Sequence, residues 1–154
     1  MVTIKPKTTI GMKLSAKAAS HTRTDVSVRD MTSIIDEPEA RGGTNKGLTP
    51  TETLMSSLLG CTNVISQRIA HHMGVTIGSM DIALSVQFDR RGVMLEEDVE
   101  RPFSNVVMDI DVTTDATAEQ MEKLKTDLQK FCPIAKVIRG GGVTITENWN
   151  VSGL

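Results

Sequence analysis

The 154-residue sequence predicts an α+β fold, and three observations support the prediction. Several short segments alternate apolar and polar residues, which is typical of half-buried strands. Residues 50–73 instead repeat their apolar side chains every three or four positions, which is typical of a helix. Hydrophobic residues make up 39% of the chain, enough for one ordinary globular core. We therefore expect short strands packed around a long helix.

The N-terminal part, residues 1–36, is expected to consist of strands. Pro38 ends this part, because proline has no N–H to donate to a sheet. The pattern predicts strands at residues 9–18 and 26–35, a polar turn at residues 20–25 and a glycine-rich loop at residues 42–47.

The central helix, residues 50–73, has the clearest start signal in the chain. Thr49 and Glu52 form a capping box, and Pro50 occupies the first helical position. Gly74 supplies the stop. The apolar stripe of this helix consists of Leu54, Leu58, Cys61, Ile65 and Ile69. A thiol in that stripe should be largely buried.

The C-terminal part, residues 75–154, mixes strands and helices. Thr117 is the expected cap of a second helix, and Cys132-Pro133 separates it from a short third one. The pattern places strands at residues 75–88, 105–112 and 143–151, the short helix at 134–139 and a glycine break at 140–142. All three parts are expected to form a single domain over residues 1–154.

Composition and charge exclude several classes of function. A formal net charge of −2 and only 3% aromatic residues argue against nucleic-acid binding. No apolar run approaches the length of a membrane span, and no signal peptide is evident. We therefore expect a cytoplasmic protein that binds neither nucleic acid nor membranes. Two cysteines in such a chain are free, catalytic or redox-active thiols, or inert buried ones.

The two cysteines differ in their expected surroundings. Cys61 lies in the middle of the central helix, where apolar neighbours raise the pKa of a thiol and make it inert. Cys132 precedes Pro133 and is the expected cap of the short helix, where the helix dipole and the nearby Lys136 and Arg139 favour the thiolate. These local signals favour a reactive thiol at Cys132, and Cys61 would need a nearby cation or hydrogen-bond donor to become reactive.

Two motifs in this sequence resemble those of a known family. Thr49-Pro50-Thr51-Glu52-Thr53-Leu54, followed by Leu58-Leu59-Gly60-Cys61-Thr62, is similar to the stretch Pro-x-Glu-x-Leu…Gly-Cys-Thr of OsmC/Ohr-like proteins. Cys132-Pro133, after an amphipathic helix and before the last strand, is similar to their second motif. The loop from Asp36 to Gly43 also resembles the one that leads into the first long helix of these proteins.

The resemblance implies an OsmC-like α+β fold, in which two antiparallel sheets flank long central helices in an intertwined homodimer. In the peroxidase members, the helix cysteine attacks an organic hydroperoxide and the Cys-Pro cysteine resolves the sulfenic acid as a disulfide, which a dithiol reductant reopens. By position, Cys61 would be peroxidatic and Cys132 resolving, so the two should approach each other. No cofactor or metal is implied. Arg23 is the candidate for the arginine that stabilises the thiolate, with Arg29 and Arg41 as rivals.

The glutamate that assists in those peroxidases follows the motif proline directly, whereas this chain has Thr51 there and the carboxylate at Glu52. Glu52 is therefore a candidate catalytic residue. Its place in the capping box offers a second explanation for a glutamate at this position. Glu52 precedes Cys61 by nine residues, roughly 13 Å and half a turn around a straight helix. A kink, an irregular first turn or a second subunit would have to bring the two together.

Three functions follow from these observations. The first is a peroxidase that uses Cys61, Cys132, Arg23 and Glu52. The second is a non-catalytic or redox-sensing protein that binds an apolar ligand, and the third is a structural homodimer with inert thiols. His71 and His72 are adjacent on a helix, so their rings diverge and should not chelate one metal.

Overall fold

The computed structural model of the protein describes residues 8–154. Residues 1–7, which belong to the expected N-terminal strand region, lie outside the described residues. The chain forms two compact units, Met1–Leu54 and Met55–Leu154. The long helix α1, Pro50–His72, begins in the first unit and continues in the second. A single domain over the whole chain stays a prediction.

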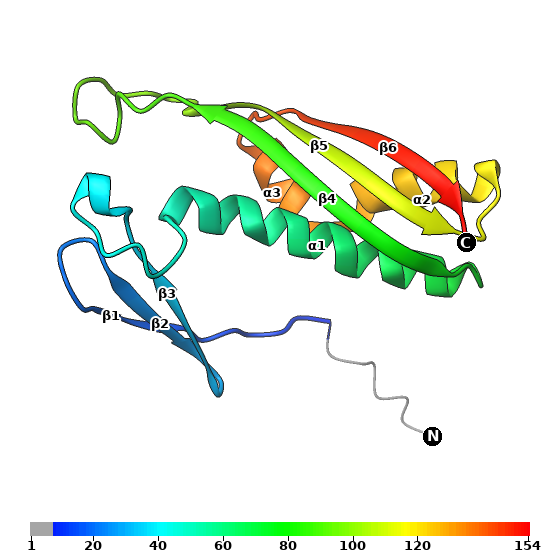
Figure 1. The fold of residues 1–154 in the computed structure, drawn as a ribbon, viewed down its shortest axis with the longest axis horizontal. Coiled ribbons are helices and arrows are strands. Elements are labelled where there is room, and N and C mark those ends of the chain that lie inside the picture. The colour runs from blue at the N-terminus through cyan, green and yellow to red at the C-terminus, as the bar shows by residue number, and fades with distance from the viewer. Residues whose placement is uncertain (1–7) are drawn as a thin grey trace. The chain divides into compact units, whose positions relative to one another are not determined.

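The first unit contains a three-stranded antiparallel sheet in the order β1-β2-β3 (Figure 1). Its strands are β1 (Ser15–Ala18), β2 (Thr24–Val28) and β3 (Met31–Ile35). Two expectations were wrong here. The first strand begins only at Ser15, because residues 9–14 are exposed and pair with no strand. The segment 26–35 is two strands, because Arg29 adopts a positive φ of 54° and turns the chain back between Val28 and Met31.

The loop between β3 and α1 is organised around the buried carboxylate of Asp36. It accepts hydrogen bonds from the hydroxyl and N–H of Thr44 and from the N–H groups of Glu37 and Lys46. These donors, the Thr44 hydroxyl first, hold the pKa of Asp36 far below its usual range. Gly43 must be glycine, since a Cβ there would lie 1.7 Å from the carbonyl oxygen of Glu37. The short 3-10 helix η1 (Glu39–Arg41) lies in this loop.

The second unit contains the other sheet and most of the helices. Its elements after α1 are β4 (Ile77–Phe88), β5 (Phe103–Thr114), α2 (Ala118–Phe131), α3 (Pro133–Gly140) and β6 (Ile145–Gly153). The strand order is β4-β5-β6. β4 and β5 are antiparallel, whereas β6 runs parallel to β5 after the α2–α3 crossover. The α+β class with two small sheets is confirmed, but this second sheet is mixed rather than antiparallel.

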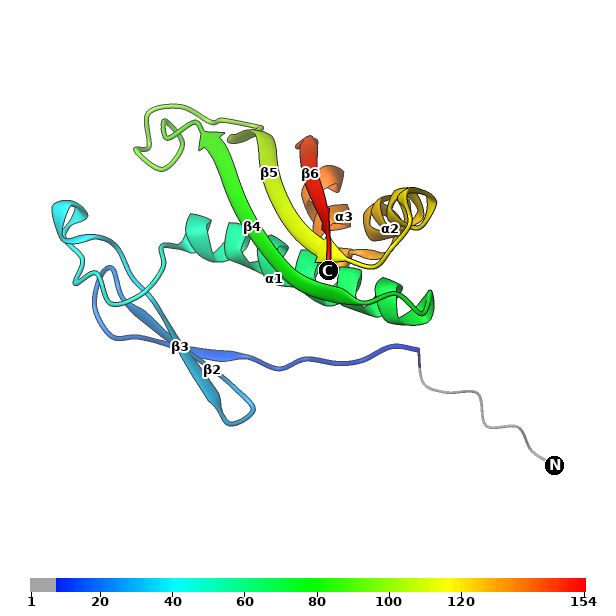
Figure 2. The ribbon, with the colours of Figure 1, turned by 45° about the vertical axis from the view of Figure 1, so that its right-hand side comes forward.

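The core of the second unit lies between its sheet and its helices, which cover one face of the sheet (Figure 2). Along β5, buried Val106, Met108, Ile110 and Val112 alternate with half-buried Val107 and the exposed Asp109 and Asp111. The face of α1 that is most deeply buried includes Leu58, Thr62, Ser66 and Ile69. It differs from the expected stripe, because the small polar residues Thr62 and Ser66 pack inward. Cys61 and Ile65 therefore lie at the margin of this face, half-buried.

Candidate functional site

Cys61 and Cys132 meet in the second unit. The Sγ of Cys132 donates a hydrogen bond to the Sγ of Cys61 across 2.9 Å, although 71 residues separate them in sequence. Both are free thiols. The expected approach of the two cysteines is confirmed. A disulfide has an S–S distance of about 2.05 Å, so the sulfurs would need to close by about 1 Å to form one.

Local hydrogen bonds fix Cys132 at the junction of two helices. Its N–H donates to the carbonyl of Leu128 at 2.9 Å, which ends α2. Its Sγ accepts the N–H of Ala135 at 3.4 Å, which begins α3, and Pro133 occupies the first position of that helix. The expected capping role of Cys132 is therefore confirmed. The junction places a thiol on a short, well-defined turn that faces α1.

The exposure and ionisation of Cys132 contradict the expectation from its capping position. Cys132 is only 1% exposed, whereas Cys61 is half-buried. Burial first, and then the hydrogen bond to Cys61, raise the pKa of Cys132 to about 11, although the Ala135 N–H acts in the opposite direction. The local effect of the helix terminus exists, but loss of solvent outweighs it. Cys132 thus keeps its proton at neutral pH and donates it toward Cys61.

Arg23 lies in the first unit and pairs with a residue that sequence reasoning missed. Its Nε and Nη2 donate to the two carboxylate oxygens of Asp25 at 2.7 and 3.2 Å. The hydrogen bond and the charge of Asp25 raise the pKa of Arg23. Arg23 directly precedes β2 and Asp25 lies within it, so the spacing of two residues in extended backbone could have identified the pair. The role of Arg23 at Cys61 stays a prediction.

The rival arginines also lie in the first unit. Arg29 is exposed at the turn between β2 and β3, where its positive φ reverses the chain. Arg41 forms an ion pair with Glu37 at 2.7 Å. Their possible roles at Cys61, like that of Arg23, stay predictions.

Glu52 takes part in the capping box that the sequence predicts. The N–H of Thr49 donates to the Glu52 carboxylate at 2.8 Å, and the N–H of Glu52 donates to the Thr49 hydroxyl at 3.3 Å. The N–H and hydroxyl of Thr49, and then the charge of Arg41, lower the pKa of Glu52. The capping role is confirmed, and the catalytic role of Glu52 stays a prediction.

Arg139 was expected to add positive charge near Cys132, but it binds a carboxylate. Its Nη2 donates to Glu147 at 3.3 Å, and the indole N–H of Trp149 donates to the other oxygen of Glu147, also at 3.3 Å. The Glu147 side chain is only 6% exposed. These contacts connect α3, which Cys132 caps, to β6. Sequence reasoning missed Glu147, because its partners are fixed by the α3–β6 packing.

Neither a metal-binding cluster nor a membrane-spanning helix is found among the described residues. Across residues 8–154, no group of three or more His, Cys, Asp or Glu side chains is placed to hold a metal ion. In the same part of the chain, no helix is both long enough and apolar enough to cross a membrane.

The fold and the site together define a small α+β protein with two thiols in contact. The sequence model of the family described as OsmC-like protein matches residues 43–148. The chain therefore belongs to the OsmC-like family. A comparison with curated protein sequences found no match.

Solved structures share the fold at low sequence identity. An OsmC-like protein from Mycoplasma pneumoniae has a TM-score of 0.74 at 14% identity, over 94% of this chain and 98% of its own. An organic hydroperoxide resistance protein OsmC from Legionella pneumophila has a TM-score of 0.65 at 13% identity, over 94% and 99%. The organic hydroperoxide resistance protein OhrB of Bacillus subtilis has a TM-score of 0.59 at 19% identity, over 92% and 98%. At these identities the similarity establishes the fold alone.

Proposed function

We propose that this protein is a thiol-dependent peroxidase that reduces organic hydroperoxides, with Cys61 as the nucleophile and Cys132 as the resolving thiol. The observation that supports this most directly is the 2.9 Å distance between their sulfurs. Two similar structures are described as organic hydroperoxide resistance proteins, which is consistent with the proposal.

The assignment of roles follows from the difference between the thiols. Cys61 is half-buried and therefore the more accessible to a substrate. Cys132 is buried, and burial raises its pKa, so it is protonated in the reduced pair. A two-cysteine mechanism needs an accessible thiol that meets the substrate and a second thiol within reach of it.

The reaction proceeds in three steps. The Cys61 thiolate attacks the terminal peroxide oxygen, the O–O bond breaks, and the alkoxide takes a proton and leaves as the alcohol. Cys61 is then a sulfenic acid, its sulfur oxidised by two electrons. The Cys132 sulfur attacks the Cys61 sulfur, the S–S bond forms and the S–O bond breaks, and the departing hydroxide takes the Cys132 proton as water. A dithiol reductant reopens the disulfide by exchange and is itself oxidised to a disulfide.

The proposal extends to the surroundings of the reaction. In this proposal Arg23 stabilises the Cys61 thiolate, and Glu52 orients that arginine. The protein acts as a homodimer built around α1. Apolar residues in the same packed cluster as the thiols, among them Leu58 and Ile65, favour organic hydroperoxides over hydrogen peroxide. A cytoplasmic location supplies the reducing conditions that keep both thiols free between turnovers.

The experiment that tests the proposal follows hydroperoxide consumption with dithiothreitol as the reductant. Wild-type protein should reduce cumene hydroperoxide well above the rate of the dithiol alone, and Cys61→Ser should abolish this activity. Arg23→Ala should slow the first oxidation of Cys61, because a neighbouring cation stabilises a thiolate. A wild-type rate no greater than the dithiol background would rule out the peroxidase.

A second candidate is a redox-sensing or non-catalytic protein that binds an apolar ligand. The observation that favours it is an apolar hollow of about 470 Å³ between α1 and α2. The displaced glutamate register at Thr51 and Glu52 is consistent with lost catalysis. The same hydroperoxide assay separates the two candidates, because a binding protein would show ligand affinity without turnover.

A further inference from the structure

The buried polar contact between α3 and β6 takes no part in the three proposed steps of the reaction. In this contact Glu147 accepts hydrogen bonds from Arg139 and Trp149, both at 3.3 Å, and its side chain is only 6% exposed. A buried ion pair is often no more stabilising than apolar residues of the same volume, so stability alone does not account for it. Apolar side chains can repack, whereas a buried charge requires its partners in one arrangement. The contact is therefore suited to fixing the position of α3.

α3 connects this contact to one of the thiols. Cys132 caps its first turn, and Arg139 lies in its last turn, roughly 10 Å away along the axis. Ala135 lies between them at steps of three and four residues, so all three share one face of the helix. The backbone hydrogen bonds of the helix keep this spacing constant. A shift of Arg139 is therefore passed on to the Cys132 sulfur.

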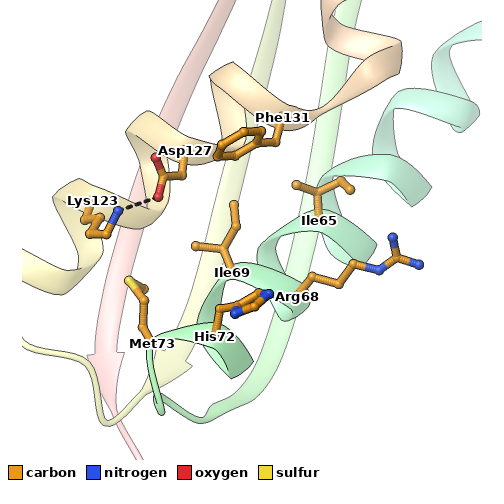
Figure 3. Close-up of a pocket in the computed structure, with 8 residues that line it drawn as sticks. All are labelled: Ile65, Arg68, Ile69, His72, Met73, Lys123, Asp127 and Phe131. Carbon is orange, nitrogen blue, oxygen red and sulfur yellow. Dashed lines mark hydrogen bonds and ion pairs between the residues drawn. The ribbon is translucent and has the colours of Figure 1, made fainter. Parts of the chain in front are cut away.

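The other helix that meets Cys132 has open space at this point. Phe131, the last residue of α2, is 55% exposed and lines the hollow between α1 and α2. Figure 3 shows Phe131 on α2 and Ile65 and Ile69 on α1, on opposite sides of this hollow. The empty space leaves the end of α2 room to shift. The turn at Cys132 therefore depends on α3 for its position.

The residue beside Glu147 in the sheet contacts the helix that carries Cys61. Glu147 is the register partner of Met108 on β5. The Met108 sulfur accepts a hydrogen bond from the hydroxyl of Thr62 at 3.9 Å, and Thr62 directly follows Cys61 on α1. Met108 and Thr62 are each only 1% exposed. The register pair Met108–Glu147 thus contacts α1 next to one thiol and anchors α3, which the other thiol caps.

We propose that Glu147 is a positioning residue for the thiol pair. By holding α3 through Arg139 and Trp149, it keeps the Cys132 sulfur in contact with that of Cys61. This inference rests on the proposed function for its role in turnover, but the approach of the two thiols can be measured without any peroxide. Without Glu147, α3 has more than one position on β6, the sulfurs meet less often, and the disulfide is easier to reduce.

The first test measures the stability of the disulfide. Reduced protein is equilibrated with defined mixtures of reduced and oxidised dithiothreitol. As the S–S bond forms, Cys61 and Cys132 together lose two electrons and two protons to oxidised dithiothreitol. Mass spectrometry after alkylation gives the disulfide fraction. Glu147→Ala should lower the equilibrium constant about three- to tenfold, which corresponds to about 14–30 mV. Glu147→Gln, which keeps one acceptor oxygen, should lower it less.

A destabilised control separates positioning from stability. The equilibrium constant depends only on the difference in stability between the oxidised and reduced forms, so a residue that stabilises both equally leaves it unchanged. Val112→Ala opens a cavity in the same core, four residues beyond Met108 on β5. It should lower the urea midpoint without moving the equilibrium constant. Trp149 is the only tryptophan of the chain, so its emission shows whether each variant is folded and whether the contact has changed.

A double variant tests whether the two charged residues act as one contact. Arg139→Ala should reproduce the loss seen in Glu147→Ala. The variant with both substitutions should lose no more than either alone, because either one already breaks the pair. If an alanine variant does not fold, Glu147→Gln and Arg139→Lys are used for the same comparison.

The outcomes distinguish the positioning role from the peroxidase. An unchanged equilibrium constant in the folded Glu147 variants, or an equal change in Val112→Ala, would overturn the positioning role. A wild type that forms no disulfide in oxidised dithiothreitol would overturn both proposals. A disulfide that depends on Glu147, in a protein that reduces no cumene hydroperoxide, would support the positioning role and reject the peroxidase. Peroxidase activity with a disulfide that is indifferent to Glu147 would do the reverse.

Discussion

The sulfur of Cys132 accepts the backbone N–H of Ala135 at 3.4 Å while its proton is directed at Cys61. One side chain thus performs two tasks: it caps α3 and it supplies the second thiol of the pair. Substitutions at this position affect stability and chemistry in different ways, because a hydroxyl can cap a helix but cannot form a disulfide.

The first prediction separates these two tasks. Cys132→Ser should keep the cap, whereas Cys132→Ala should lose it and lower the free energy of unfolding by about 0.5–2 kcal/mol relative to serine. Both variants should allow one turnover with cumene hydroperoxide and then hold Cys61 as a sulfenic acid. Urea denaturation measures the cap, and labelling by dimedone followed by mass spectrometry detects the sulfenic acid. Failure of either variant to label at Cys61 would argue against Cys61 as the nucleophile.

The second prediction concerns alkaline pH. The pKa of Cys132 rises from an ordinary value of 9.0 to about 11 in the folded protein, so the folded state holds this proton more tightly than the unfolded state does. The associated stability is fully present below pH 9 and is lost as the pH rises toward 11. Between pH 8 and pH 11 the reduced wild type should lose roughly 1–2 kcal/mol more than Cys132→Ser. Parallel urea titrations in a phosphine reductant measure this difference, and identical pH profiles would contradict it.

The third prediction decides between the two interpretations of Glu52. Glu52→Ala removes the acceptor of the Thr49 N–H and should cost about 0.5–2 kcal/mol, whereas Glu52→Gln keeps an acceptor and should cost less. Because the pKa of Glu52 is lowered, its contribution is present above pH 4.5 and is lost as the pH falls through the lowered value.

Kinetics supply the second readout for Glu52. A residue that only caps the helix leaves the rate of Cys61 oxidation unchanged in both variants. If the Glu52 carboxylate orients the thiolate-stabilising arginine, its loss slows Cys61 oxidation in both variants. Glu52→Gln is then slow although it keeps the cap. Stopped-flow measurement of single-turnover oxidation distinguishes these results.

The fourth prediction concerns the contact between α3 and β6. Glu147→Ala removes the acceptor for Arg139 and Trp149 at a site that is almost fully buried, and should lower the free energy of unfolding by about 1–3 kcal/mol. Glu147→Gln retains acceptor capacity and should cost less. Thr146→Ala, at an exposed neighbouring position, serves as the control. Equal stability of the alanine and wild-type proteins would show that the contact does not hold α3 in place.

The helix caps show which local features could be predicted from sequence. Thr49 with Glu52, Thr117 with Gln120, and Cys132 with Ala135 are all pairs within one helical turn. Their hydrogen bonds depend only on the local backbone, so the capping signals placed the helix starts correctly. The strand boundaries were predicted less well. Residues 26–35 were expected as one strand, because the turn at Arg29 contains no glycine or asparagine that would indicate it.

The sequence by itself determined the α+β class, the helices and their caps, and, through the family resemblance, the pairing of Cys61 with Cys132. Tertiary structure alone decided that Cys132 is the buried, protonated thiol and Cys61 the accessible one. It also decided that Arg139 pairs with Glu147, that β6 runs parallel to β5, and that a hollow lies between α1 and α2. Helix caps arise from contacts within a few residues, whereas desolvation, ion-pair partners and cavities arise from segments far apart in the chain that pack together.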